Sequence, residues 1–216
     1  MEHHDELKNH FFYEILPPSQ RTLLNDLARQ EWLGSFYLVG GTALALHIGH
    51  RISIDFDFFS RNEFNNHNVM RHLSDLGEFD LFEEGRDTIH GSLNGVKLSF
   101  LRYRYPVIKP LHPLHFLNLA DIFDIALMKL SAISGRGAKK DFIDFYFLLQ
   151  RLNLTELLAA YSEKYGEGVS HHYHLFKSLV YFQDAEHEPM PRMIQPAEWA
   201  DVKRFMVQTV KEIGFF

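Results

Sequence analysis

The chain contains no cysteine, and this absence excludes disulfides, thiolate catalysis and zinc sites built on cysteine. It also lacks an apolar run of the roughly 18 residues that a membrane span requires, and its start, MEHHDELKNHFFYEILPP, lacks the basic and then apolar layout of a signal peptide. We therefore expect a cytoplasmic protein that makes no membrane contact. Its 216 residues, 46% of them hydrophobic, suffice for one domain with an appendage or for two small domains.

An excess of positive charge is absent as well. The net charge of −6 argues against a chain that coats nucleic acid non-specifically. The charge is uneven, because residues 97–140 carry +6 and the remainder carries −12. The basic residues of this stretch, called the basic stretch below, are Lys97, Arg102, Arg104, Lys109, Lys129, Arg136, Lys139 and Lys140. They either form a local phosphate-attracting surface or simply solvate helix and strand faces.

The hydrophobic periodicity predicts an α/β region followed by a helical region. In the first region we expect amphipathic helices over Ser19–Trp32 and Asn65–Leu76, with a short buried strand, FYLV, between them. TALALHIGH is typical of a helix, and we expect Thr42 to be its N-cap. Three further strands are predicted in EFDLFEE, TIHGSL and VKLSFLRYR, the last two joined by an LNG hairpin turn.

From LNLADIF onward the pattern becomes helical, with a break at SGRG. Later helices are predicted over Thr155–Lys164, His171–Phe182 and Pro196–Ile213. We therefore place a boundary near residue 115 and expect two domains, 1–115 and 116–216. The predicted fold class is α/β (α+β), with a small mixed sheet first and helices after it.

Two carboxylates stand in the apolar run ISIDFDFF. Its two-residue alternation predicts Ile54, Phe56 and Phe58 on one strand face and Asp55 and Asp57 on the other. Carboxylates that converge repel each other unless a divalent cation neutralises both. Hard oxygen ligands favour Mg²⁺ or Mn²⁺, ions that usually keep phosphate oxygens in their shell. We predict that Asp55 and Asp57 are metal ligands.

A glycine-rich loop precedes these carboxylates. Gly40 and Gly41 allow the backbone to approach a ligand closely, and the first N–H groups of the following helix can bind an anion. The Thr42 hydroxyl is predicted to add a donor. Gly-Gly alone usually marks a turn, and Asp-x-Asp alone is common on solvated strands. Their order along the chain indicates a phosphate and metal site.

The arrangement resembles the minimal nucleotidyltransferase fold of the DNA polymerase beta superfamily, in which a Gly-Gly or Gly-Ser loop precedes an apolar strand carrying two aspartates. GGTALALHIGHRISIDFDFFS together with DIALMKLSAISGRGAKKDFIDFYFLL is similar to the AbiEii/AbiGii toxin family of bacterial toxin–antitoxin and abortive-infection systems. The resemblance covers roughly residues 36–151. It implies transfer of a nucleoside monophosphate from an NTP to an acceptor, with tRNA expected first, and a cognate antitoxin protein as a partner.

The resemblance also implies roles for individual residues. Gly40, Gly41 and Thr42 would hold the triphosphate, and Asp55 and Asp57 would ligate the metal. In the downstream motif, Lys129 and Asp141 would contact the nucleotide, Lys140 would contact it and act in catalysis, and Asp144 would be catalytic. The nucleotide is expected between the two domains. Without a function, Lys140 and Asp144 would instead form an i,i+4 pair on a solvated helix.

One position departs from the superfamily pattern. Many relatives carry a third carboxylate on a later strand, but here that strand reads GVKLSFLRY, with Lys97 and Ser99 where an acid is expected. Either two aspartates suffice, with Asp141 or Asp144 assisting, or the acceptor chemistry differs from polymerisation. Two alternatives therefore stay open. The acceptor can be a protein hydroxyl, or the fold can be a catalytically inactive binding module.

Overall fold

The computed structural model describes residues 11–166 and 172–214. The chain forms two compact units. The first unit ends at Pro106 and resumes over Pro110–Asp121, and the second comprises Val107–Lys109 and the chain from Ile122 onward. The sequence placed the boundary at residue 115, but β6 (His112–Leu114) and β7 (Leu117–Leu119) belong to the sheet of the first unit. The prediction of helix from Leu117 onward is therefore wrong at its start.

The first unit is built on a seven-stranded mixed sheet with strand order β3-β4-β5-β2-β1-β7-β6. Its remaining strands are β1 (Tyr37–Val39), β2 (Phe56–Ser60), β3 (Phe79–Gly85), β4 (Thr88–Leu93) and β5 (Val96–Arg102). Strand β2 pairs antiparallel with β1 and parallel with β5. The three strands predicted within residues 78–104 and the hairpin turn at Asn94-Gly95 are confirmed, and both turn residues have positive φ, as a two-residue hairpin requires.

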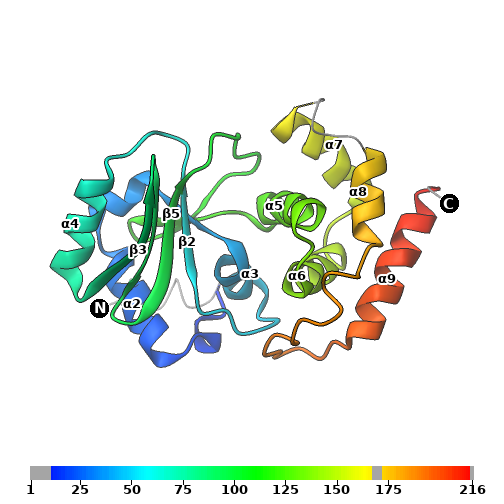
Figure 1. Cartoon of the computed structure of the whole chain (residues 1–216), viewed down its shortest axis with the longest axis horizontal. Coiled ribbons are helices and arrows are strands. Elements are labelled where there is room, and N and C mark those ends of the chain that lie inside the picture. Colours follow the sequence, from blue (N-terminus) through cyan, green and yellow to red (C-terminus); the bar gives the residue numbers. More distant parts are fainter. Residues whose placement is uncertain (1–10, 167–171, 215–216) are drawn as a thin grey trace. The chain divides into compact units, whose positions relative to one another are not determined.

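Helices flank this sheet. They are α2 (Pro18–Ala28), α3 (Gly40–Ile48) and α4 (Asn66–Leu76), with short 3-10 turns η2 (Tyr13–Ile15) and η3 (Glu31–Ser35). Figure 1 shows α3 and α4 on opposite sides of the sheet. Trp32, which the sequence assigned to the first helix, lies in η3, stacks on His72 of α4 and packs against Phe100 of β5. The apolar face of β2 and β5 is thereby covered on the α4 side.

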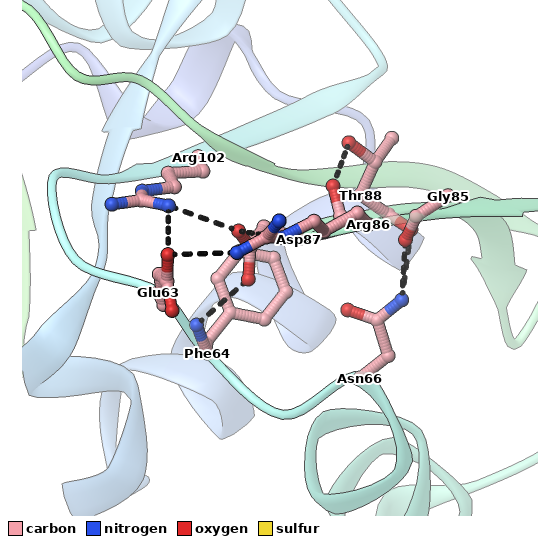
Figure 2. A network of polar contacts seen from close by, with 8 residues as sticks. All are labelled: Glu63, Phe64, Asn66, Gly85, Arg86, Asp87, Thr88 and Arg102. Atoms are coloured by element: carbon pink, nitrogen blue, oxygen red, sulfur yellow. Dashed lines mark hydrogen bonds and ion pairs between the residues drawn. The ribbon is translucent and has the colours of Figure 1, made fainter.

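A polar network holds the loop after β2 in place (Figure 2). Asp87, in the turn between β3 and β4, is 8% exposed and accepts a hydrogen bond from the Phe64 backbone N–H at 3.2 Å. The Arg102 guanidinium, at the end of β5, bridges Asp87 and Glu63. The loop, the turn and the strand end are thus fixed to one another, which anchors the C-terminal end of β2.

The second unit is helical, as predicted. Its helices are α5 (Ile122–Gly135), α6 (Lys139–Leu149), α7 (Leu154–Tyr165), α8 (His172–Leu179) and α9 (Trp199–Glu212). The predicted helix over His171–Phe182 ends earlier, at Leu179, and His171 lies outside the described residues. No helix in the described part of the chain is long and apolar enough to span a membrane.

Candidate active site

The glycine pair begins a helix directly after a buried strand. Helix α3 starts at Gly40, with Val39 of β1 as its N-cap residue, so the prediction that Thr42 is the N-cap is wrong. Gly40 has φ +71°, a backbone conformation that favours glycine. This single residue converts the extended chain of β1 into the helix. Because the first N–H groups of a helix lack partners within it, the turn presents donors at this point.

Thr42 is fully buried, and its hydroxyl donates a hydrogen bond to the backbone carbonyl of Asp55 at 2.5 Å. A threonine hydroxyl has one proton to donate. The predicted use of this hydroxyl as a phosphate donor therefore conflicts with its position. Its side chain instead fastens α3 to the segment that leads into β2, and only its backbone N–H is left for an anion.

Asp57 lies in the middle of the site. In β2, Phe56, Phe58 and Ser60 are buried while Asp57 and Phe59 are partly exposed, so the predicted alternation holds within the strand. The Asp57 Oδ1 atom accepts a hydrogen bond from the Ser99 hydroxyl at 2.7 Å. A Cβ built on Gly40 would lie 2.6 Å from Asp57 Oδ2. The second carboxylate oxygen therefore faces the start of α3, as the phosphate and metal interpretation requires.

Asp55 precedes the strand, which begins at Phe56. Its side chain is exposed. Ile54 is 51% exposed and does not join the buried face with Phe56 and Phe58, so that part of the alternation prediction is wrong. The reason is that the two-residue period applies only where the chain is paired in the sheet. Asp55 is accordingly held by its backbone, through Thr42, rather than by strand pairing.

A cation lies beside the second glycine. A Cβ on Gly41 would collide with the Arg51 guanidinium and lie 2.9 Å from Ser53 Oγ. Arg51 is 5% exposed and donates to the Ile52 carbonyl at 3.1 Å. The two glycines thus make room for groups of opposite charge, a carboxylate at Gly40 and a guanidinium at Gly41. The position of Arg51 close after α3 in the sequence was the available signal.

The register partners of Asp57 on the neighbouring strands show which residues stand where a third acid is expected. In the strand register, Asp57 of β2 pairs with Val39 on one side and with Ser99 on the other, and Ser99 pairs in turn with His90 of β4. Side chains paired in this way lie on the same face. A hydroxyl and then an imidazole therefore follow Asp57 along one row. Sequence reasoning missed His90, because its strand neighbour is set by the hairpin register.

The motif of the second unit forms a separate cluster. Lys129 of α5 contacts Asp141 at 2.9 Å and Asp144 at 2.5 Å, and the Arg136 guanidinium donates twice to Asp141. Both aspartate side chains are fully buried. Burial alone would raise the pKa of Asp141, but the charges and hydrogen bonds of Lys129 and Arg136 outweigh it, so this pKa lies below its ordinary value.

The cluster fixes α5 against α6, and this explains where Lys140 lies. The i,i+4 pair between Lys140 and Asp144 does not form, because Asp144 points inward to Lys129. Lys140 is exposed. Within the described residues, the structure brings together Gly40, Gly41, Thr42, Asp55 and Asp57 in the first unit and Lys129, Asp141 and Asp144 in the second. The nucleotide and catalytic roles expected for the second group stay predictions.

The basic stretch is not a continuous positive surface. Arg102 pairs with Glu63 and Asp87, Lys129 and Arg136 pair with buried aspartates, and Lys139 donates to the carbonyls of Glu186 and Glu188. The exposed members are Lys97, Arg104, Lys109 and Lys140, together with Arg136, which is paired with Asp141. The sequence count of +6 therefore overstates the charge that a phosphate backbone would meet.

In the part of the chain that the structure describes, no group of three or more histidine, aspartate or glutamate side chains could hold a metal ion. Asp55 and Asp57 supply only two carboxylates, one fewer than such a group requires. Its donors are nevertheless carboxylate oxygens, with one Asp57 oxygen directed at the glycine turn. This donor chemistry fits a hard divalent cation that takes its other ligands from water and phosphate.

The strand, glycine turn, helix and aspartate strand together define a nucleotidyltransferase fold. Residues 22–117 match the family model described as nucleotidyl transferase AbiEii toxin, type IV toxin–antitoxin system. An uncharacterized protein of Aquifex aeolicus is 37% identical over 203 residues, which cover 91% of this chain and 97% of that protein. The chain belongs to the AbiEii nucleotidyltransferase toxin family, and it is a nucleotidyltransferase. The recognition of this family is confirmed, and the matched residues contain the first of the two motifs on which it was based.

Solved structures show the same fold. JHP933 from Helicobacter pylori aligns with a TM-score of 0.55 and 18% identity, covering 90% of each chain. The nucleotidyltransferase toxin MenT4 from Mycobacterium tuberculosis aligns with a TM-score of 0.52 and 14% identity, covering 91% of this chain and 86% of that one. The predicted fold class, a mixed sheet followed by helices, is thereby confirmed.

Proposed function

We propose that this nucleotidyltransferase transfers a nucleoside monophosphate from an NTP to an RNA acceptor, with tRNA first, and that Asp55 and Asp57 hold a divalent cation for the reaction. The observation that carries the proposal is the position of Asp57 Oδ2, which faces Gly40 at the start of α3. A triphosphate bound by the first N–H groups of that helix would meet this carboxylate. As a member of its family the protein is also expected to have a cognate antitoxin.

Different residues of the chain would bind the phosphates and the cation. The α3 N–H groups from Gly40 to Thr42 bind phosphate oxygens, and the Arg51 guanidinium beside Gly41 adds positive charge. The Asp57 and Asp55 carboxylates hold the cation. When bound, Mg²⁺ or Mn²⁺ would neutralise charge on the phosphates and on the leaving pyrophosphate. The acceptor oxygen forms a bond to the α-phosphorus as the bond from that phosphorus to pyrophosphate breaks, and the acceptor hydroxyl releases its proton to solvent.

Fewer exposed basic residues support an RNA acceptor than the charge count of the sequence suggested. Lys97 and Arg104 are exposed on β5 and just after it. Lys97 precedes Leu98, which pairs with Phe56, so it lies next to the position of Asp55. The cationic side chain of Lys97 at this edge of the site would attract a phosphate backbone and make binding salt-sensitive, whereas Arg104 follows the opposite end of β5. The tRNA itself rests on the family resemblance.

The test uses purified protein, each of four α-labelled NTPs and Mg²⁺, with separate pools of tRNA and of protein. We expect label in the tRNA pool and a drop of at least about 100-fold in the Asp57→Asn variant, the size seen when one electrostatic contributor is removed. Asp80→Asn, on edge strand β3, is the control and should transfer normally. Label in protein alone would redirect the proposal to protein nucleotidylation.

A separate experiment tests the alternative that the fold is a catalytically inactive binding module. Calorimetry with NTP and Mg²⁺ should detect binding to the wild type and not to the double variant Asp55→Ala, Asp57→Ala. If no NTP binds, and the double variant is as toxic in cells as the wild type, then the fold acts as a binding module and the catalytic proposal is overturned.

A further inference from the structure

We infer that Ser99 is a positioning residue for Asp57. Its hydroxyl holds Oδ1 of the carboxylate and so directs Oδ2 toward the cation and the triphosphate. This inference rests on the proposed function and deepens it. It assigns a role to the position at which many related enzymes carry a third carboxylate.

The contact is built into the sheet. Ser99 and Asp57 are register partners on the parallel strands β5 and β2, and their side chains meet at 2.7 Å. Ser99 is 6% exposed, so water competes little for its hydroxyl. The carboxylate cannot rotate about its last bond without losing this hydrogen bond, whose partner would then be buried and unsatisfied. Asp57 is thus held in one orientation.

The two oxygens of Asp57 lie in different surroundings. Oδ1 is occupied by Ser99, whereas Oδ2 lies 2.6 Å from the position that a Cβ on Gly40 would take. Glycine at residue 40 therefore allows Oδ2 to lie close to the start of α3, where the first N–H groups lack partners within the helix. A cation at Oδ2 would be shared with an anion bound at those donors. Groups that orient a metal ligand in this way commonly set the metal affinity.

A hydroxyl at residue 99 can stabilise the Asp57 carboxylate, whereas an acid at this position would repel it. A carboxylate at residue 99 would lie against Asp57 and repel it whenever no cation separates them. A serine instead donates a hydrogen bond to Asp57 and leaves its charge in place. The site therefore has two charged ligands and one neutral group that orients the inner one, so the loss of the third acid need not mean the loss of metal binding.

The chain offers a matched control. Ser92 of β4 is also 6% exposed, and its hydroxyl faces a carboxylate oxygen, Asp80 Oδ2, at 3.4 Å. It lies in the same sheet but outside the glycine turn. Removing the Ser92 hydroxyl measures what a buried serine contributes to the fold. Removing the Ser99 hydroxyl measures that contribution and the effect on Asp57.

The experiment titrates the whole protein with Mn²⁺ alone and follows the free ion by electron paramagnetic resonance. Ser99→Ala should weaken Mn²⁺ binding by about tenfold, as loss of a group that orients a metal ligand typically does. Ser99→Thr, which keeps the hydroxyl, should bind nearly as the wild type does, and Ser92→Ala should be unchanged. In the transfer assay, Ser99→Ala should raise the Mg²⁺ concentration for half-maximal rate by a similar factor.

The outcomes separate the two proposals. If the wild type binds Mn²⁺ and Asp57→Asn does not, but Ser99→Ala binds as the wild type does, the role of Ser99 is refuted and the proposed function stands. If Ser99→Thr is as weak as Ser99→Ala, the hydroxyl is not the active feature and the inference also fails. If the wild type neither binds Mn²⁺ nor transfers nucleotide, the proposed function is what fails.

Discussion

The two units use aspartate in opposite ways. Asp57 in the first unit is partly exposed, has one hydroxyl partner and keeps an oxygen beside a glycine turn. Asp124 and Asp141 in the second unit are fully buried and surrounded by cations and N–H groups. A carboxylate whose charge the protein already neutralises stabilises the fold, whereas one with an open oxygen can bind a ligand. Burial and partners, not residue type, separate the two roles.

The largest effect on stability is expected at Asp124. It accepts hydrogen bonds from the backbone N–H groups of Ile108 and Lys109, and its ion pair with Lys164 at 2.6 Å has both side chains fully buried. Asp124→Asn removes the negative charge that faces the buried Lys164 ammonium, and breaking a buried ion pair costs about 3–5 kcal/mol of unfolding free energy. Urea denaturation followed by circular dichroism measures it.

Asp57→Asn tests whether Asp57 differs in its structural role from the buried aspartates of the second unit. It should change the unfolding free energy by less than about 1 kcal/mol, because an asparagine can still accept the Ser99 hydrogen bond. The comparison would collapse if Asp57→Asn destabilised the protein as much as Asp124→Asn does. Asp57 would then be a structural residue like those of the second unit.

After Asp124, the largest loss of unfolding free energy is expected at the glycine turn. Gly40→Ala places an alanine at φ +71° and its Cβ against Asp57, whereas Gly95→Ala meets similar backbone strain at φ +78° with nothing within 4 Å. Each variant should lose about 1–2 kcal/mol of unfolding free energy from strain alone. Only Gly40→Ala should also lose nucleotide transfer and Mn²⁺ binding. Equal transfer by the two variants would show that the space in front of Asp57 Oδ2 is not needed.

The smallest effect concerns Arg136, whose side chain is 63% exposed beside the buried Asp141. Arg136→Ala should lower the unfolding free energy at pH 7 by up to about 1 kcal/mol, the size of an exposed pair. Because the pKa of Asp141 is depressed in the fold, this contribution is complete above the ordinary aspartate pKa and is lost as the pH falls through the folded value.

Denaturation midpoints of the wild type and Arg136→Ala should therefore converge as the pH is lowered from 7 to below the depressed pKa of Asp141. Arg204→Ala, whose partner Asp201 is exposed, is the control and should differ little from the wild type at either pH. A gap between wild type and Arg136→Ala that widened on acidification would contradict the depressed pKa.

Most elements of the first unit could be predicted from the sequence. Its strands alternate strongly, and Asn65 and Asn94-Gly95 are local signals for a helix start and a hairpin turn. The errors lie where local pattern is weak or is overridden. Thr42 has the residue type of an N-cap, yet the helix begins at Gly40. Leu117–Leu119 continues an apolar pattern that suits a helix, but pairing with β1 makes it a strand.

The sequence by itself determined the fold class and the family, and it singled out two carboxylates and two glycines as candidate site residues, because these depend on periodicity and on the order of motifs along the chain. Only the tertiary structure decided which aspartates keep an open oxygen. The hydroxyl that holds Asp57 comes from a residue 42 positions away, and the lysine that neutralises Asp124 comes from one 40 positions away. Strand register and helix packing set such pairs, and neither leaves a mark in local spacing.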